Sequence, residues 1–397
     1  MHLITSLLIL LTASRLLGRL FQALGYFAIV GEILAGFILG PAIFDLVRPS
    51  ESLTGIVDLA IFLLIFAAGL EVDFKDFMQS LKSKTLLFSV IAFLGSFSGG
   101  LLFGFYFDLS FIGSVIIGLC FSITSIPVAL GFLSNLKING TPLGNAAMGS
   151  SIVIEIICLF VLGISLDIEG THSVLDYSKL IISKGFLMCV FCGIVIIVNR
   201  FLRAEIHHIQ RTQKLFSALV KALGEEAIFG VGVLFVLLFS TASEALGFHF
   251  VIGAFFGGML LNKDIIGTDF FNSLTLTLES ITKHFLTPIF FAYLGLLIKT
   301  DSFENFLFIG ALFGVGYGSK IFSSWVGARL SGFNKVDALK LGLILNSRGT
   351  FDLIVADLGL SKKYIDAKVF SILVLFSILS IVFNPVFYRR LPPSQKE

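Results

Sequence analysis

The sequence predicts an all-α membrane protein of about thirteen transmembrane helices, and three observations lead to this fold class. Hydrophobic residues make up 56% of the 397 residues and charged residues only 14%, a balance that a water-soluble domain could not cover with polar surface. The length allows on the order of a dozen spans of about 20 residues in one bundle. Finally, the long apolar runs are bounded by charged residues or by Gly and Pro.

The helices are expected in order along the chain, at the apolar runs. The expected spans are residues 2–21, 27–46, 54–72, 84–106, 110–135, 142–166, 178–199, 224–246, 248–262, 284–299, 304–330, 337–358 and 367–387. The first residues lack a basic leader region and a cleavage motif, so we expect a membrane helix there rather than a removable signal.

One transmembrane transporter domain is expected to cover residues 1–397. Its first half is expected at residues 1–166 and its second half at residues 223–390, with a short cytoplasmic tail at 391–397. A linker helix and an amphipathic connector would occupy residues 167–222. The connector is expected from Phe201 to Ala222, because this segment, which includes His207 and His208, is too polar to span and would lie along the membrane surface.

The loops predict the orientation of the chain. Lys and Arg are roughly three times as frequent in one alternate set of loops as in the other, and the richer set stays in the cytoplasm. This places the N-terminus outside and the C-terminus in the cytoplasm of a cell inner membrane, which requires an odd number of spans. The net charge of +2 follows from the same bias, so no nucleic acid partner is expected.

Glu155 is the first candidate functional residue, because it lies in an otherwise uncharged helix. An ionisable side chain at membrane depth costs several kcal/mol unless it is paired or hydrated, and it therefore marks an ion pathway. A carboxylate there can bind either a proton or a dehydrated cation. A structural ion pair, or a carboxylic acid held neutral by hydrogen bonds, is the alternative explanation.

Two polar interruptions fall in corresponding positions of the two halves. They are Phe121-Ser-Ile-Thr-Ser-Ile-Pro-Val128, with Thr124, Ser125 and Pro127, and Asn346-Ser-Arg-Gly-Thr350, with Asn346, Ser347, Arg348 and Gly349. A proline inside a helix removes a hydrogen bond and frees carbonyl groups one turn earlier. A pair of such breaks indicates an inverted-repeat transporter that binds its substrate at the membrane midplane, between two crossed broken helices.

Two buried cations and one further acid complete the candidate site. Lys320 lies in the middle of an apolar helix, where it can pair with Glu155 or respond to its titration. Arg348 supplies positive charge that would offset exposed carbonyl ends at the broken helix. Asp352 follows Arg348 by four residues, so a local ion pair with a purely structural role is equally open.

Glycines at four-residue spacing predict close helix packing. Gly310, Gly314 and Gly318 form one such series, and Gly253 and Gly257 form another.

The motifs together resemble a known family. Gly31-Glu-Ile-Leu-Ala-Gly-Phe-Ile-Leu-Gly-Pro41, Gly69-Leu-Glu-Val-Asp73, Thr124-Ser-Ile-Pro127, Lys320 and Asn346-Ser-Arg-Gly349 are similar to the monovalent cation:proton antiporter-2 family, which includes Kef-type and plant cation/proton exchangers. The resemblance covers essentially the whole chain. It implies the sodium/proton antiporter fold, a homodimer with a dimerising panel, and a mobile core that alternates access like an elevator.

The resemblance also has departures. In the family, the helix equivalent to residues 142–166 carries an acidic or amide residue followed by the ion-binding acid, and this chain has Ile154-Glu155 there. Thr350 stands where many relatives carry Glu. Lys320 matches the family's buried basic position. The chain ends soon after Arg390, so the nucleotide-binding regulatory domain of Kef-type relatives is not expected, and a separate regulatory or effector subunit becomes a candidate partner.

The expected function is exchange of Na⁺ or K⁺ for protons by alternating access, with Glu155 as the shared carboxylate, Thr124 and Ser125 supplying further oxygen ligands, and Lys320 and Arg348 balancing charge. The alternative is an ion- or pH-responsive membrane subunit with little or no exchange that acts through a partner protein. No cofactor is expected, and no metal beyond the transported monovalent cation. An enzyme is not expected either, because no Ser/His pair, metal-spaced His cluster or second acidic residue accompanies Glu155 at depth.

Overall fold

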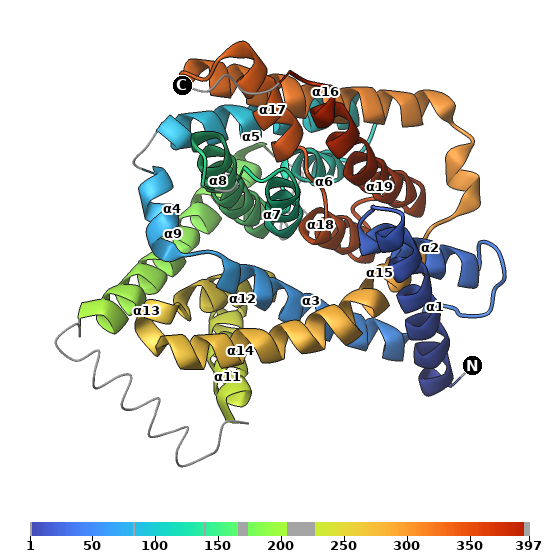
Figure 1. Ribbon diagram of the computed structural model, residues 1–397, viewed down its shortest axis with the longest axis horizontal. Helices are drawn as coiled ribbons and strands as arrows, with labels where there is room; N and C mark the ends of the chain where they lie inside the picture. Colours follow the sequence, from blue (N-terminus) through green and yellow to red (C-terminus); the bar gives the residue numbers. More distant parts are fainter. Residues whose placement is uncertain (1, 82–83, 139, 166–173, 205–226, 393–397) are drawn as a thin grey trace. The chain divides into compact units, whose positions relative to one another are not determined.

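A computed structural model describes residues 2–81, 84–138, 140–165, 174–204 and 227–392, and every regular element within these ranges is a helix (Figure 1). Nine helical segments in the described part of the chain are long and apolar enough to cross a membrane, when residues 111–134, which contain a break, are counted as one. Two shorter apolar helices, Ala28–Leu39 and Phe250–Leu260, accompany them. The expected all-α class is therefore confirmed, whereas the count of thirteen spans stays a prediction.

The chain packs as two compact units, which we describe separately. The larger unit comprises Met1–Val57, Phe77–Cys158 and Pro288–Glu397, and the smaller unit comprises Asp58–Asp76 and Leu159–Thr287. All the residues that the sequence singles out as site residues belong to the larger unit.

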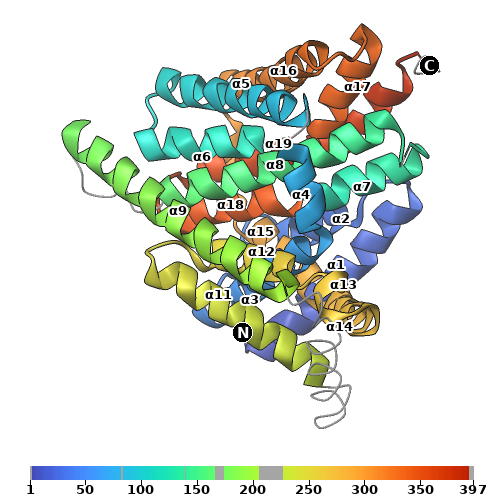
Figure 2. The same ribbon diagram turned by 90° about the vertical axis from the view of Figure 1, so that its left-hand side faces the viewer.

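The larger unit contains the broken helices and the helices that support them. These are α1 (Leu3–Ala23), α2 (Ala28–Leu39), α5 (Lys84–Tyr106), α6 (Phe111–Ser122), α7 (Ile126–Asn135), most of α8 (Pro142–Ser165), α15 (Thr287–Leu296), α16 (Phe306–Leu330), α17 (Lys335–Leu345), α18 (Thr350–Ser361) and α19 (Ala367–Arg389), with a short 3₁₀ turn, η3 (Thr300–Phe303). Helix α5 packs against both α6 and α16 (Figures 1 and 2).

Polar side chains set the starts of several of these helices. Ser110 accepts a hydrogen bond from the N–H of Gly113 at 3.0 Å and begins α6. Asn305, Asn334 and Asp366 cap α16, α17 and α19 in the same way. An N-terminal cap satisfies an N–H group that has no partner within the helix, so these residues fix where each helix enters the bundle.

Small residues bring α5 close to its neighbours. A Cβ atom added to Gly100 would lie 2.6 Å from the backbone nitrogen of Gly118 on α6, so only glycine permits this approach. The prediction of close packing for Gly310, Gly314 and Gly318 is wrong, because a Cβ at each would meet nothing within 4 Å.

The smaller unit is built from α9 (Val174–Ala204), α11 (Ala227–Ala245), α12 (Phe250–Leu260), α13 (Lys263–Ile266), α14 (Thr268–Ile281) and a single π-helical turn, η2 (Thr282–Leu286), with most of α3 (Glu51–Glu71) and the start of α4 (Phe74–Leu81). The packing predicted for Gly253 and Gly257 is confirmed, because both lie against α11, with added Cβ atoms close to Phe239.

Two segments of this unit, predicted as a loop and as a surface connector, are mostly helical where the structure describes them. The predicted loop between residues 262 and 284 is mostly the helix α14, which buries Phe270, Leu274 and Leu278 along one face. Its polar residues lower the average hydropathy, so a search for apolar runs passes over it. Of the predicted connector, Phe201–Ala204 continue α9, and the rest, with His207 and His208, lies outside the described residues.

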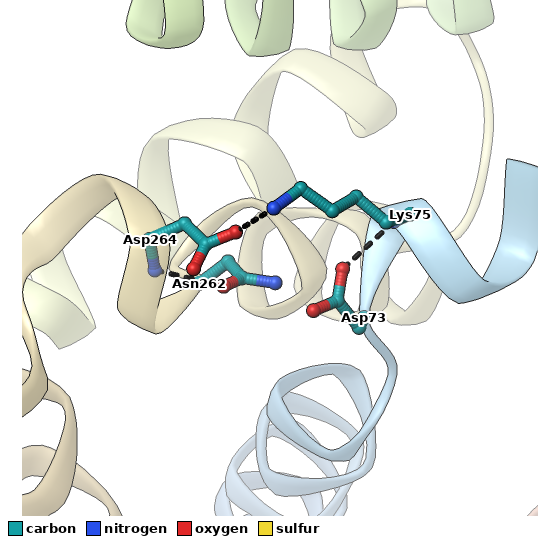
Figure 3. A network of polar contacts seen from close by, with 4 residues as sticks. All are labelled: Asp73, Lys75, Asn262 and Asp264. Carbon is teal, nitrogen blue, oxygen red and sulfur yellow. Dashed lines mark hydrogen bonds and ion pairs between the residues drawn. The ribbon is translucent and has the colours of Figure 1, made fainter. Parts of the chain in front are cut away.

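The motif residue Asp73 has a structural role at the start of α4 (Figure 3). Its Oδ1 accepts a hydrogen bond from the N–H of Lys75 at 2.7 Å. The ammonium of Lys75 forms an ion pair with Asp264 on α13, and Asn262 caps α13 by accepting from the N–H of Asp264 at 2.9 Å. This network joins the end of α3 to the end of α12 within the smaller unit.

Candidate functional site

The first break separates α6 from α7. Helix α6 ends at Ser122, and the backbone from Ile123 to Ser125 is non-helical before α7 begins at Ile126. Pro127 therefore lies in the first turn of a helix, where its missing N–H costs nothing, and does not kink a continuous helix. Because Pro127 has no N–H, the carbonyl of Ile123 has no helical donor and needs another partner.

The second break separates α17 from α18. Asn346 ends α17, and Ser347, Arg348 and Gly349 are non-helical before α18 begins at Thr350. Both interruptions predicted from the sequence are therefore full breaks, and each leaves helix ends inside the larger unit.

Asp352 caps the second of these helices. Its Oδ1 accepts from the N–H of Gly349 at 2.6 Å, and its Oδ2 accepts from the hydroxyl of Ser377 on α19. An ion pair with Arg348 is not among the ion pairs of the described residues. The local pair considered from the four-residue spacing is thus replaced by a helix cap, a favourable place for a carboxylate because the N-terminal end of a helix carries partial positive charge.

The two breaks contact each other directly. The N–H of Ser125 donates to the carbonyl of Ser347 at 2.9 Å, and the hydroxyl of Thr124 donates to the carbonyl of Leu345 at 2.6 Å. A Cβ added to Gly349 would lie 2.9 Å from the Cβ of Ser125. Glycine at position 349 therefore allows the two extended segments to cross in contact.

Arg348 binds the carbonyl end of α6. Its Nη2 donates to the carbonyl of Phe121 at 2.7 Å, and its Nη1 donates to the carbonyl of Ile123 at 3.1 Å and to that of Cys120. Nη2 also donates to Oδ1 of Asn346 at 3.2 Å. The side chain is completely buried, and its guanidinium lies 5.0 Å from the centre of an aromatic ring, that of Phe376. The carbonyl that Pro127 leaves free is thus bound by the cation of the opposite break.

Lys320 binds the carbonyl of Ser122, at the C-terminal end of α6. The side chain is completely buried on α16, and its ammonium donates to the carbonyl of Ser122. The hydroxyl of Ser122 donates to the carbonyl of Gly118 at 2.7 Å and accepts from Ser96 on α5 at 3.1 Å. The N–H of Ile123 donates to the carbonyl of Leu119. Each backbone carbonyl from residue 119 to residue 123 therefore accepts a hydrogen bond. Two cations therefore compensate the negative end of α6.

Glu155 lies on α8 with only 1% of its surface exposed. Ser151, one turn before it, donates its hydroxyl to the carbonyl of Ala147 at 2.8 Å and is also buried. Cys158, three residues after Glu155, is buried on the same helix with 1% of its surface exposed. Glu155 therefore lies in a buried turn of α8, in the same unit as Lys320 and Arg348.

The site can be described chemically from these contacts. The larger unit buries the carboxylate of Glu155 and the two cations described above, and those cations already occupy the carbonyls at the end of α6. The oxygen ligands that remain from the expected set are the carboxylate of Glu155 and the hydroxyls of Thr124 and Ser125, and the Thr124 hydroxyl has used its hydrogen on Leu345. Oxygen ligands of this kind suit alkali cations, which bind to lone pairs rather than to hydrogen-bond donors.

The sequence analysis missed four polar side chains of the larger unit. Ser377 binds Asp352, as described above, and Asn384 and Tyr317 bind one another beside Asn346. Glu32 on α2 is a further buried acid, with 4% of its surface exposed. An Asn before Pro385 inside the last apolar run was a usable signal, and so was Glu32 inside the second.

Comparison with known proteins gives one family. The model of a family described as "Sodium/hydrogen exchanger, transmembrane" matches residues 6–390.

Individual relatives are similar over nearly the whole chain. The "Probable Na(+)/H(+) antiporter GerT" of Bacillus cereus is 26% identical over 373 residues, covering 93% of this chain and 94% of that protein. The "Na(+)/H(+)-K(+) antiporter GerN" of the same organism is 25% identical over 378 residues, covering 95% and 93%. Among solved structures, the sodium proton antiporter MjNhaP1 from Methanocaldococcus jannaschii matches with a TM-score of 0.71 over 98% of both chains, at 15% sequence identity. The expected fold is therefore confirmed.

Proposed function

Because the chain belongs to the sodium/hydrogen exchanger family of transmembrane proteins, we propose that it exchanges a monovalent cation for protons by alternating access. The observation that carries this proposal is the burial of Glu155 on α8, in the same unit as the two crossed breaks and the buried cations Lys320 and Arg348. A membrane-buried carboxylate must be neutralised by a proton or by a cation, so the two ligands compete for one group.

Each of the other site residues has a role in this proposal. Thr124 and Ser125 supply hydroxyl oxygens beside the crossing, and Lys320 and Arg348 balance the charge of Glu155 as it changes ligand. Arg348 also fixes the end of α6 by its hydrogen bonds to the backbone. One competing carboxylate favours electroneutral exchange, in which one proton leaves for each cation bound.

The transported cation is Na⁺ or K⁺ in this proposal. The names of two relatives include Na⁺, and that of GerN includes K⁺ as well. We further propose that the chain is of the Kef-type or plant exchanger kind, because of its Gly31 to Pro41 motif. It would be a homodimer in a cell inner membrane, with a single transporter domain, the N-terminus outside and the C-terminus in the cytoplasm.

Exchange by the purified protein in proteoliposomes tests the proposal. With a pH-sensitive dye and an imposed pH gradient, addition of Na⁺ or K⁺ is expected to dissipate the gradient. Glu155→Gln, which keeps the size of the side chain, is expected to abolish this activity. Glu51→Gln is a matched control, since Glu51 is exposed at the start of α3, and it is expected to leave exchange unchanged. Wild-type vesicles that keep their gradient in both salts would contradict the proposal.

Ile154 makes a second function, that of an ion-responsive membrane subunit, worth testing. Ile154 is completely buried beside Glu155, so the turn lacks the polar neighbour that the resemblance implies. An ion-responsive membrane subunit that acts through a partner fits that substitution. Vesicles without exchange, together with purified protein that still binds the cation, would favour this function over antiport.

A further inference from the structure

Asn384 on α19 makes a reciprocal pair with Asn346 at the end of α17. Its Nδ2 donates to the backbone carbonyl of Asn346 at 2.7 Å, and its Oδ1 accepts from Nδ2 of Asn346 at 3.3 Å. The same Oδ1 accepts from the hydroxyl of Tyr317 on α16. Asn384 has 2% of its surface exposed, so water does not replace these partners.

The pair determines which way the Asn346 amide points. Its Nδ2 faces the Oδ1 of Asn384, and its Oδ1 accepts from Nη2 of Arg348 at 3.2 Å. A reversed amide would place two oxygens opposite each other on one side and two donors on the other. Arg348 can only donate, so the orientation is fixed from both ends.

The hydroxyl of Tyr317 strengthens this orientation. By donating to Asn384, it leaves the Asn384 oxygen as an acceptor and the Asn384 nitrogen as the donor to the Asn346 carbonyl. A chain of hydrogen bonds therefore links Tyr317 through Asn384 and Asn346 to Arg348: Arg348 donates to Asn346, and both Asn346 and Tyr317 donate to the oxygen of Asn384. Its last member holds the carbonyls of Phe121 and Ile123 across the crossing.

We propose that Asn384, oriented by Tyr317, is a positioning residue that sets the Asn346 amide and thereby holds Arg348 on the carbonyl end of α6. The proposal rests on the proposed antiport function. In this proposal, Asn384 acts through other residues and does not contact the transported ion. Both breaks are then fixed from α19 and α16, the helices that supply Asn384 and Tyr317.

Exchange kinetics provide the first test. Asn384→Ala is expected to lower the maximum exchange rate about tenfold while the half-saturating cation concentration changes by less than about threefold, because geometry is lost but no ion ligand is. Tyr317→Phe removes one donor and is expected to lower the rate about threefold. In the Asn384→Ala background its effect is expected to be clearly smaller, since the Asn384 oxygen to which the hydroxyl donates is gone.

Ser380→Ala is the matched control. Ser380 lies on α19 one turn before Asn384, is completely buried, and its hydroxyl has no hydrogen-bond partner in the described part of the chain. Ser380→Ala removes a buried polar group without removing a hydrogen bond of the described residues, so it is expected to leave exchange unchanged. Additive effects of Asn384→Ala and Tyr317→Phe, or an equal loss in Ser380→Ala, would overturn the proposal.

Backbone hydrogen–deuterium exchange gives a readout that does not need transport. Asn384→Ala is expected to raise exchange about tenfold in peptides covering residues 342–350, with a smaller rise in Tyr317→Phe and none in Ser380→Ala. Unchanged protection in Asn384→Ala overturns the positioning role even if the wild type transports. Wild-type vesicles without exchange contradict the antiport function alone, and the deuterium measurement then still decides the positioning role.

Discussion

Arg348 determines how the crossing is held together at the scale of single residues. The sequence suggested that its charge offsets carbonyl ends at a break, and the guanidinium lies on the carbonyls of α6, 225 to 228 residues earlier in the chain. Which carbonyls it binds could not be predicted, because no local pattern relates residues so far apart. The cap role of Asp352 was missed because a four-residue spacing suggests an ion pair, although residues near a helix start often bind its free N–H groups.

Substitution of Arg348 by Lys tests the role of the guanidinium. An ammonium keeps the charge but cannot donate in two directions from a planar fork, so buried carbonyls of α6 would lose their partner. We expect the free energy of unfolding to fall by about 1–3 kcal/mol and exchange to fall at least about tenfold. Thermal unfolding in detergent and proteoliposome exchange measure the two effects.

Arg329→Lys is the control for this change. Arg329 is exposed at the end of α16 and donates to the carbonyl of Phe333 at 2.7 Å. Little change is expected there, because water can replace the lost bond. Wild-type stability in Arg348→Lys would show that the carbonyls of α6 do not depend on the guanidinium.

At the scale of helices, the sequence predicted the interruptions better than the connections. The run from 110 to 135 became α6 and α7, and the run from 337 to 358 became α17 and α18, each broken where polar residues interrupt it. Helix α14 was missed because its apolar residues recur every four positions while its average hydropathy is low. The glycines of α16 show the limit of such patterns, because a four-residue spacing says nothing about whether a neighbouring helix is present.

The close crossing of the breaks predicts a strong effect of Gly349→Ala. The added Cβ would approach Val128 to 2.8 Å and Ser125 closer still, so the two segments must separate. We expect the melting temperature and the exchange rate both to fall. Gly310→Ala on α16 is the matched control, since nothing lies within 4 Å of an added Cβ. It is expected to be neutral or to stabilise by up to about 1 kcal/mol, because Ala favours a helix. Equal effects at the two positions would refute close contact at the crossing.

Pro127→Ala tests whether the first break must stay open. Alanine restores an N–H that can donate to the Ile123 carbonyl, in competition with Arg348, and so favours a continuous helix. We expect exchange to fall while the melting temperature stays the same or rises, a combination that simple misfolding does not produce. Pro142→Ala, at the first residue of α8, is the comparison variant and should change neither quantity. Unchanged exchange in Pro127→Ala would mean that the break does not depend on the proline.

At the scale of the whole molecule, composition, length and the apolar runs led to the fold class, since a chain so rich in apolar residues needs lipid to cover its surface. The relation to a solved antiporter with 15% sequence identity shows that the arrangement of helices persists where few residues are shared. That arrangement was expected from the resemblance of the motifs to a known family, and the apolar runs and breaks agree with it. The exact packing of one helix on another depends on side-chain contacts, which the hydropathy of the sequence does not predict.

The predicted orientation of the chain can be tested with single cysteines in a Cys189→Ser background. Ser50 lies before α3 in a loop expected outside, and Lys335 begins α17 at an end expected in the cytoplasm, and both are exposed. A membrane-impermeant maleimide added to intact cells is expected to label Ser50→Cys but not Lys335→Cys, and both should react after permeabilisation. The reverse pattern would invert the topology derived from the Lys and Arg distribution.

Proton release on cation binding tests the central claim most directly. Purified protein in weakly buffered detergent solution is titrated with Na⁺ or K⁺ while the pH of the solution is followed. If Glu155 exchanges one ligand for the other, the wild type releases protons in a saturable manner, and Glu155→Gln releases none. Equal release from the wild type and Glu155→Gln, or cation binding by the wild type without any release, would contradict the account.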